Sequence, residues 1–211
     1  MSETGAKGYD RQVFINCPFD EEYLPLLRAI AFVLKACRFA PRCALEADSA
    51  VEVRVEKILR IISECGLSIH DISRTQLDRQ SKLPRFNMPF ELGLFLGAAR
   101  LGGKRHQRKG ALILDVEKFR YQKYLSDIAG QDIRAHGNDP ATAIGAIRDW
   151  LNTQNTSNEV LPGKAALVAQ YRGFQKRLPA LLKRLQLKET EMSFVDWLKL
   201  IGLWLEGTTM V

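Results

Sequence analysis

The sequence has little of the material from which metal sites and disulfide frameworks are built. It holds four cysteines and three histidines in 211 residues, and no two cysteines form a CxxC pair. Structural zinc sites and disulfide-rich folds need several closely spaced thiols or imidazoles. We therefore expect no metal site and no disulfide framework. Small buried thiols in a reducing cytosol are the favoured interpretation of Cys17, Cys37, Cys43 and Cys65.

Long apolar runs are also missing. No run approaches the roughly 20 residues that cross a bilayer, and the opening MSETGAKGYDRQ lacks the apolar core of a signal peptide. These absences predict a soluble cytoplasmic protein with no membrane partner. The net charge of +7 permits an anionic partner but does not require one.

Two phosphate-binding fingerprints are absent as well. No GxGxxG follows the first apolar run, and no GxxxxGK[ST] occurs anywhere. Both motifs cradle phosphates with backbone N–H groups at the start of a helix. Their absence excludes the usual dinucleotide-binding and P-loop sites, so a nucleotide would have to be bound in another way.

What the chain does contain is a repeated alternation of short β-rich runs and amphipathic helical patterns. This order predicts an α/β fold with a doubly wound parallel five-stranded sheet and helices on both faces. The apolar runs VFI and ALILDV fit strands that are buried on both sides. We expect strands at 12–16, 39–46, 66–73, 110–116 and 132–137, and helices at 21–37, 49–65, 86–102 and 139–151.

The composition changes after Trp150. A polar segment, NTQNTSNE, is followed by a helical pattern at 163–188, with a break possible at Pro179, and by an amphipathic stretch at 193–206. We read residues 11–152 as the α/β domain and residues 158–211 as a small C-terminal helical appendage. The appendage carries seven basic residues between 164 and 188 and no acid. That run could contact nucleic acid, but a solvated helix face is the favoured explanation.

One carboxylate stands out in the stretch RFNMPFELGLFLGAAR. Between Phe86 and Ala99, Glu91 is the only ionisable side chain. It could be an acid in the first helical turn, favoured by the helix dipole and partly exposed. Alternatively it faces a cleft at the carboxyl edge of the sheet, where ligands of parallel α/β folds bind. Gly93 and Gly97, four residues apart, predict that this helix presses closely on a neighbour.

The same region carries a resemblance. HDISRTQLDRQSKLPRFNMPFELGLFLGAAR matches the pattern Asp-(Ile/Leu)-(Ser/Thr), a variable loop, and Asn-x-x-(Phe/Tyr)-Glu-Leu-Gly. This pattern resembles the TIR-like nucleotide-binding proteins of bacterial antiphage defence and the nucleoside deoxyribosyltransferases of the same flavodoxin-like build. The opening VFINCPFDEEYLPLLRAI is similar to their first strand and helix. The resemblance covers about residues 11–150, and Pro89 departs from the apolar or small residue usual there.

The resemblance implies a flavodoxin-like fold and a catalytic Glu91. It implies an NAD-cleaving N-glycosidase of a defence or signalling pathway, with cyclisation or base exchange as variants of the reaction. The alternatives are a nucleoside or nucleotide N-deoxyribosyltransferase-like enzyme and a non-catalytic nucleotide-sensing module. Related enzymes act as assemblies, so a homo-oligomer or a partner-activated form is expected. NAD would be a substrate, and no cofactor is expected.

A single carboxylate is enough for the N-glycosidic cleavage that the resemblance implies. Cleaving an N-glycosidic bond passes through an oxocarbenium-like cation, which a carboxylate can stabilise or attack. Nicotinamide leaves NAD as a neutral molecule, so no strong general acid is required. Candidate substrate-binding residues at the strand and helix ends are Asn16, Cys17, Asp71 and Asn87, with Cys17 as a packing thiol rather than a nucleophile. Arg42, Arg54 and Arg74 could meet phosphate, although surface charge or capping is the favoured explanation for each.

Overall fold

A computed structural model describes residues 8–46, 51–75, 77, 82–157 and 159–208. Five parallel strands form one sheet in the order β2-β1-β3-β4-β5. This is the strand order of the flavodoxin-like fold, and the predicted fold class is confirmed. The strands are β1 (Gln12–Asn16), β2 (Ala40–Arg42), β3 (Leu67–Asp71), β4 (Gly110–Asp115) and β5 (Ile133–Ala135).

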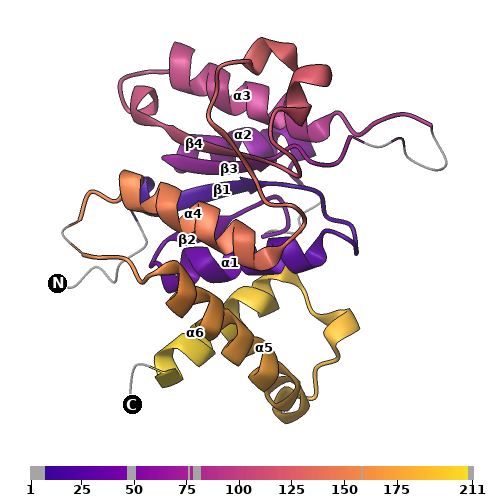
Figure 1. Cartoon of the computed structure of the whole chain (residues 1–211), viewed down its shortest axis with the longest axis vertical. Coiled ribbons are helices and arrows are strands. Elements are labelled where there is room, and N and C mark those ends of the chain that lie inside the picture. The colour runs from indigo at the N-terminus through magenta and orange to yellow at the C-terminus, as the bar shows by residue number, and fades with distance from the viewer. Residues whose placement is uncertain (1–7, 47–50, 76, 78–81, 158, 209–211) are drawn as a thin grey trace.

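Helices cover both faces of the sheet (Figure 1). On one face, α2 (Arg54–Glu64) and α3 (Asn87–Leu101) pack on Phe14 of β1 through an apolar cluster that includes Ile58, Ile61 and Phe95. On the other face, α1 (Leu24–Ala36) and α4 (Pro140–Gln154) bury Val13, Ile15 and Leu112. α4 begins as its sequence predicts, because the Asp139 carboxylate accepts hydrogen bonds from the backbone N–H groups of Ala141 and Thr142.

The C-terminal helices form a further layer on the outer side of α1 (Figure 1). α5 (Lys164–Leu185) and α6 (Phe194–Thr208) join the same hydrophobic cluster as the sheet. The Phe32 ring of α1 stacks on Phe174 at 5.6 Å and lies 5.9 Å from Trp204. The Trp197 indole N–H donates to the Arg28 carbonyl at 3.2 Å. Residues 158–211 therefore share one core with the α/β layers wherever they are described.

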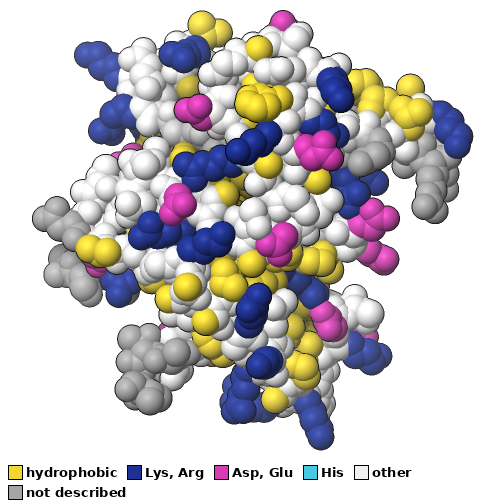
Figure 2. Space-filling model, viewed as in Figure 1, with side chains coloured by type: hydrophobic (Ala, Val, Ile, Leu, Met, Phe, Trp, Pro, Cys, Tyr) yellow, Lys and Arg dark blue, Asp and Glu magenta, His cyan; other side chains and the backbone are white. Residues whose placement is uncertain are grey.

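The outward face of α5 is basic. Lys176, Arg177, Lys183 and Arg184 are all exposed on it, and Lys and Arg side chains gather at the lower end of the molecule (Figure 2). The helix runs without interruption through Pro179, where the sequence suggested a break. No helix within the described part of the chain is long and apolar enough to cross a membrane.

Several element boundaries differ from expectation. The second strand is limited to three residues, because the chain turns after Arg42. The helix expected from residue 49 begins at Arg54. The expectation for the two α3 glycines was wrong: a Cβ added at Gly93 or Gly97 would meet no heavy atom within 4 Å. These glycines face open space, so close helix packing does not explain them.

Candidate functional site

Polar side chains are buried where the strands end. β1, β3 and β4 finish in Asn16, Asp71 and Asp115, and each of these side chains is at most 2% exposed. A buried polar group is costly unless the fold or a ligand satisfies it. This carboxyl edge of the sheet, where α2 and α3 also begin, is therefore the region in which to look for a site.

The Asn16 amide connects three elements at this edge. Its Nδ2 donates to the Met88 carbonyl at 2.8 Å and lies 2.9 Å from His70 Nδ1. Since both amide protons are used in this way, His70 Nδ1 is the acceptor and its Nε2 carries the proton. Asn16 thus holds the end of β1 against β3 and against the first turn of α3. Both N–H groups of its amide are thus engaged by the protein rather than presented to a ligand.

His70 is a buried neutral imidazole. It contacts the Phe14 and Phe95 rings edge-on at 5.9 and 5.3 Å. Burial lowers the pKa of His70 to about 3. Its Nε2 has no hydrogen-bond partner among the described residues. His70 therefore lies in the layer between the sheet and helices α2 and α3, and it serves as the acceptor for Asn16.

Glu91 is the fifth residue of α3, one turn further into the helix than the first-turn position considered from the sequence. It is 6% exposed, and no hydrogen bond or ion pair joins its carboxylate to another described residue. Burial raises the pKa of Glu91 to about 7, and Arg54 opposes that rise. At neutral pH the side chain is thus divided between its ionised and protonated forms. Such a carboxyl group can act as a base, a nucleophile or an acid.

Cys17 follows Asn16 and is 3% exposed. The pKa of its thiol is raised, first by burial and then by the neighbouring charges of Cys43, Asp71 and Glu91. A thiol that resists ionisation is a poor nucleophile. The predicted role as a packing thiol therefore fits the structure. The same interactions show that Cys17, Asp71 and Glu91 share one electrostatic environment.

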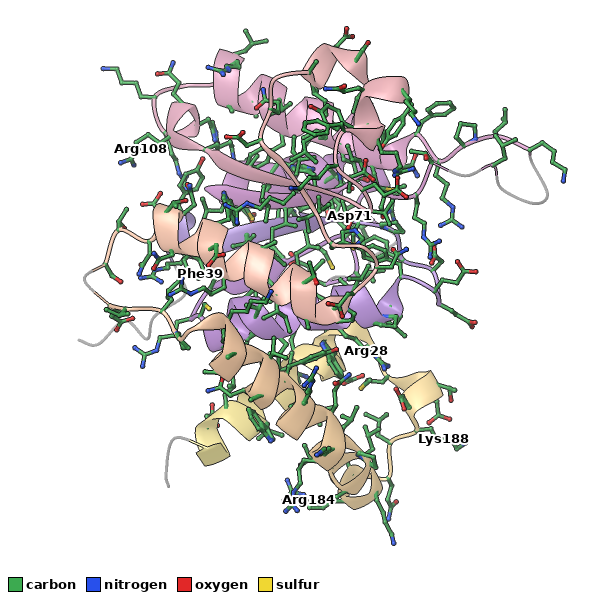
Figure 3. All side chains as sticks on the ribbon, viewed as in Figure 1. Arg28, Phe39, Asp71, Arg108, Arg184 and Lys188 are labelled. Carbon is green, nitrogen blue, oxygen red and sulfur yellow. The ribbon has the colours of Figure 1, made fainter. Side chains whose placement is uncertain are left out.

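The fold engages both oxygens of the Asp71 carboxylate. Tyr23 Oη donates to Oδ2 at 2.6 Å, the Ser73 backbone N–H donates to Oδ1 at 2.8 Å, and His136 Nε2 lies 3.0 Å from Oδ2. His136 Nδ1 accepts from the Asn138 backbone N–H, so Nε2 carries a proton, and this N–H forms no hydrogen bond with the described residues although it lies close to Asp71. Asp71, labelled in Figure 3, thereby ties β3 to the start of α1 and to the loop after β5. It orders the edge of the sheet.

Asn87 behaves differently from the other candidates. It is the first residue of α3 and is exposed, and α3 has no side-chain cap. The structure therefore brings Asn16, Cys17, Asp71 and Glu91 to one edge of the sheet and leaves Asn87 on its surface. Sequence reasoning missed Tyr23 and His136 as partners of Asp71. Only the position of His136 directly after β5 offered a signal.

Two ion-pair networks hold the loops around this edge. Asp20, in the loop after β1, pairs with Arg74 at 3.3 Å and with Arg85 at 3.1 Å. Arg120 bonds Asp115, and it also donates to the Ser73 carbonyl and to the Thr75 hydroxyl, each at 2.7 Å. Charged groups of this kind fix the path of a loop when several act together.

No group of three or more His, Cys, Asp or Glu side chains that could hold a metal ion occurs within the described ranges. All four cysteines are free and buried. Compared with known proteins, the chain matches no family model, no curated protein and no solved structure.

Proposed function

We propose that this chain cleaves the N-glycosidic bond of NAD, with the Glu91 carboxylate acting on the ribosyl carbon. One observation supports this above the others: Glu91 is a buried carboxyl group without a partner among the described residues, held at the ligand edge of a parallel α/β sheet. Buried acids are normally paired. An unpaired one is retained at a cost in stability, which is the pattern of functional sites.

The raised pKa suits a cationic substrate. The nicotinamide ring of NAD carries a positive charge, and an opposite charge nearby favours the ionised form of a carboxyl group. Substrate binding would therefore deprotonate Glu91 when its charge is needed. The carboxylate then stabilises, or attacks, the oxocarbenium-like ribosyl cation as neutral nicotinamide leaves. Water, or a second acceptor in cyclisation or base exchange, completes the reaction on the same carbon.

The surrounding residues position this group. Asn16 fixes the start of α3 three residues before Glu91 through the Met88 carbonyl. Asp71, Tyr23 and His136 hold the edge of the sheet below it. Rigid support of this kind is what places a reacting carboxylate to within a fraction of an ångström. The setting in antiphage defence or signalling, and activity as an assembly, rest on the resemblance of residues 70–100 to TIR-like proteins.

A second candidate is a nucleoside or nucleotide N-deoxyribosyltransferase-like activity. The Glu91 pKa of about 7 favours it, because a protonated fraction at neutral pH can pass a proton to a leaving base that is neutral in the substrate. A third candidate, a nucleotide sensor without turnover, predicts thermal stabilisation by a nucleotide that is recovered unchanged.

One experiment separates the three. The purified chain is incubated with NAD and with a panel of nucleosides and nucleoside monophosphates, and the products are separated by chromatography. Release of nicotinamide supports the first proposal, and release or exchange of a nucleobase supports the second. A nucleotide that raises the melting temperature and is recovered unchanged supports the sensor. Unchanged NAD at every protein concentration, including those that favour assembly, counts against the first proposal.

A further inference from the structure

Most of the net charge of the chain lies on one helix. The whole chain has a net charge of +7. Helix α5 alone carries six basic residues and no acid, namely Lys164, Arg172, Lys176, Arg177, Lys183 and Arg184. The rest of the sequence is therefore close to neutral. Lys and Arg side chains gather over the lower end of the molecule (Figure 2), where α5 lies. A charge concentrated in this way favours contact with an anionic partner.

Five of these cations lie away from the core. The buried residues of α5 face the sheet side and are Leu167, Tyr171, Phe174, Leu178 and Leu182. Arg172, Lys176 and Lys183 are four and seven residues apart, so they share the opposite side of the helix. Arg177 and Arg184, also seven residues apart, flank them, and Arg184 is labelled at the lower end of the molecule in Figure 3. All five are exposed. We call them the basic face of α5, and they extend over about 18 Å of helix axis.

The protein supplies no acid to this surface. None of the five side chains forms a hydrogen bond or an ion pair with another described residue. By contrast, Arg42 pairs with both Glu46 and Glu64. A solvated helix face usually mixes both signs of charge. Like charges one turn apart, such as Arg172 and Lys176, destabilise a helix. The basic face thus retains a repulsion that a bound polyanion would remove, which a merely solvated face does not explain.

The residues between the cations indicate which polyanion fits. They are small or polar and exposed, namely Ala169, Gln175, Pro179 and Ala180. Every residue of α5 is described, and its two aromatic side chains, Tyr171 and Phe174, are buried. The helix therefore offers no platform for stacking the bases of a single strand and no aromatic anchor for a protein interface. Its apolar face is packed in the core, so it is not free to enter a membrane surface. Contact with phosphates is what this surface can provide.

We propose that the basic face of α5 binds the phosphate backbone of a double-stranded nucleic acid, independently of base sequence. Lys and Arg side chains neutralise phosphates and release the counterions condensed on them, which drives such binding. The convex side of a helix can lie against a duplex while its other side stays in the protein core. This surface is separate from the candidate site at Glu91, and the proposal does not require NAD cleavage.

The test measures binding of the full chain to a short labelled DNA duplex by fluorescence anisotropy between about 50 and 200 mM salt. One variant combines Lys176→Gln with Lys183→Gln. The matched control combines Lys118→Gln with Lys123→Gln, which removes the same charge from two exposed lysines between β4 and β5. For the unmodified chain we expect the logarithm of the affinity to fall with the logarithm of the salt concentration with a slope of about −3 to −4.

The α5 variant should bind about tenfold to a hundredfold more weakly, with a slope smaller by about 2, and the control should bind as the unmodified chain does. Arginine at positions 176 and 183 should preserve binding, and a duplex of different sequence should bind equally well. Absence of duplex binding at about 50 mM salt, or an equal loss in both double variants, overturns the inference. So does tighter binding to a single strand, or binding to phosphatidylserine vesicles in place of the duplex. Nicotinamide release is measured separately, so the proposed function stands or falls on its own experiment.

Discussion

Asn16 Nδ2 donates a hydrogen bond to the carbonyl oxygen of Met88 at 2.8 Å, joining the end of β1 to the first turn of α3. Three residues later in the same helix comes Glu91. The amide is 2% exposed, so the bond is shielded from water. The position of the Glu91 carboxylate on α3 thus depends on a side chain at the end of β1.

Replacing Asn16 by Ala should loosen the start of α3. The Met88 carbonyl and His70 Nδ1 both lose their donor, and one unsatisfied buried polar group costs about 1–3 kcal/mol. We expect a lower free energy of unfolding and a lower kcat, measured by urea denaturation and by product analysis. Asn152→Ala, at an exposed position of α4, is the control and should change neither. Wild-type stability in Asn16→Ala would show that the bond does not hold the helix.

The raised pKa of Glu91 predicts how stability depends on pH. The folded chain holds the Glu91 proton up to about pH 7, whereas the unfolded chain releases it near its ordinary pKa of 4.5. The contribution of the Glu91 proton to the free energy of unfolding is therefore fully present below pH 4.5, and it is lost as the pH rises through 7. Glu91→Gln, which cannot ionise, should gain stability relative to the wild type over this interval, by up to about 2 kcal/mol once solvent screening is allowed for.

Denaturant melts of both proteins at pH 5 and pH 8 measure this difference. We expect Glu91→Gln to have a higher free energy of unfolding than the wild type at pH 8, and this difference to be smaller at pH 5. A margin that is the same at both values would mean that the Glu91 pKa is not raised by the fold.

His70 predicts the opposite trend at lower pH. Its pKa in the folded chain is lowered to about 3, against 6.5 in the unfolded chain. Between these values His70 binds a proton in the unfolded chain but not in the folded chain. The free energy of unfolding therefore falls as the pH drops from 6.5 towards 3. This one group contributes about 1.4 kcal/mol per pH unit in that range. His70→Gln should show a shallower decline between pH 6.5 and 4, measured by denaturant melts. Parallel declines would contradict a buried neutral imidazole.

The C-terminal helices are expected to be required for folding. Phe174 is fully buried and stacks on Phe32 of α1. Phe174→Ala should lower the free energy of unfolding by about 3–5 kcal/mol, the usual cost of an aromatic cavity. Removal of residues 158–211 should expose the outer side of α1 and give an aggregating protein, seen by size-exclusion chromatography. A soluble, fully folded truncation would show that α1 needs no outer layer.

Much of the fold could be predicted from the sequence because the strands are short, apolar and separated by helical patterns. The five strands, their parallel arrangement and the start of α4 at Pro140 follow from such local signals. The outer layer formed by α5 and α6 was harder to predict from the sequence. All residues of α1 from Ala29 to Leu34 are fully buried, Phe32 and Val33 among them, but a single amphipathic face is the first explanation of its pattern. Only its partner helices, distant in sequence, reveal why Phe32 is there.

The candidate site was predictable in one respect and not in another. A single acid within an apolar helix is visible in the sequence, and so is its place after the third strand. The partners of Asp71 were not visible, because Tyr23 and His136 come from the start of α1 and the loop after β5. Nor could the sequence show which of the arginines Arg42, Arg54 and Arg74 would be paired with carboxylates. In the structure Arg42 pairs with Glu46 and Arg74 pairs with Asp20, which are contacts that depend on the three-dimensional fold.

The most direct test of the central claim compares Glu91→Gln with Glu206→Gln. Both variants exchange one carboxylate for an amide, but Glu206 is an exposed residue of α6, far along the chain from the candidate site. Each is incubated with NAD beside the unmodified chain, and nicotinamide release is followed by chromatography, with circular dichroism as the check on folding. We expect release by the unmodified chain and by Glu206→Gln, and a loss of at least about a hundredfold in Glu91→Gln. Nicotinamide release by Glu91→Gln at the unmodified rate would contradict the account.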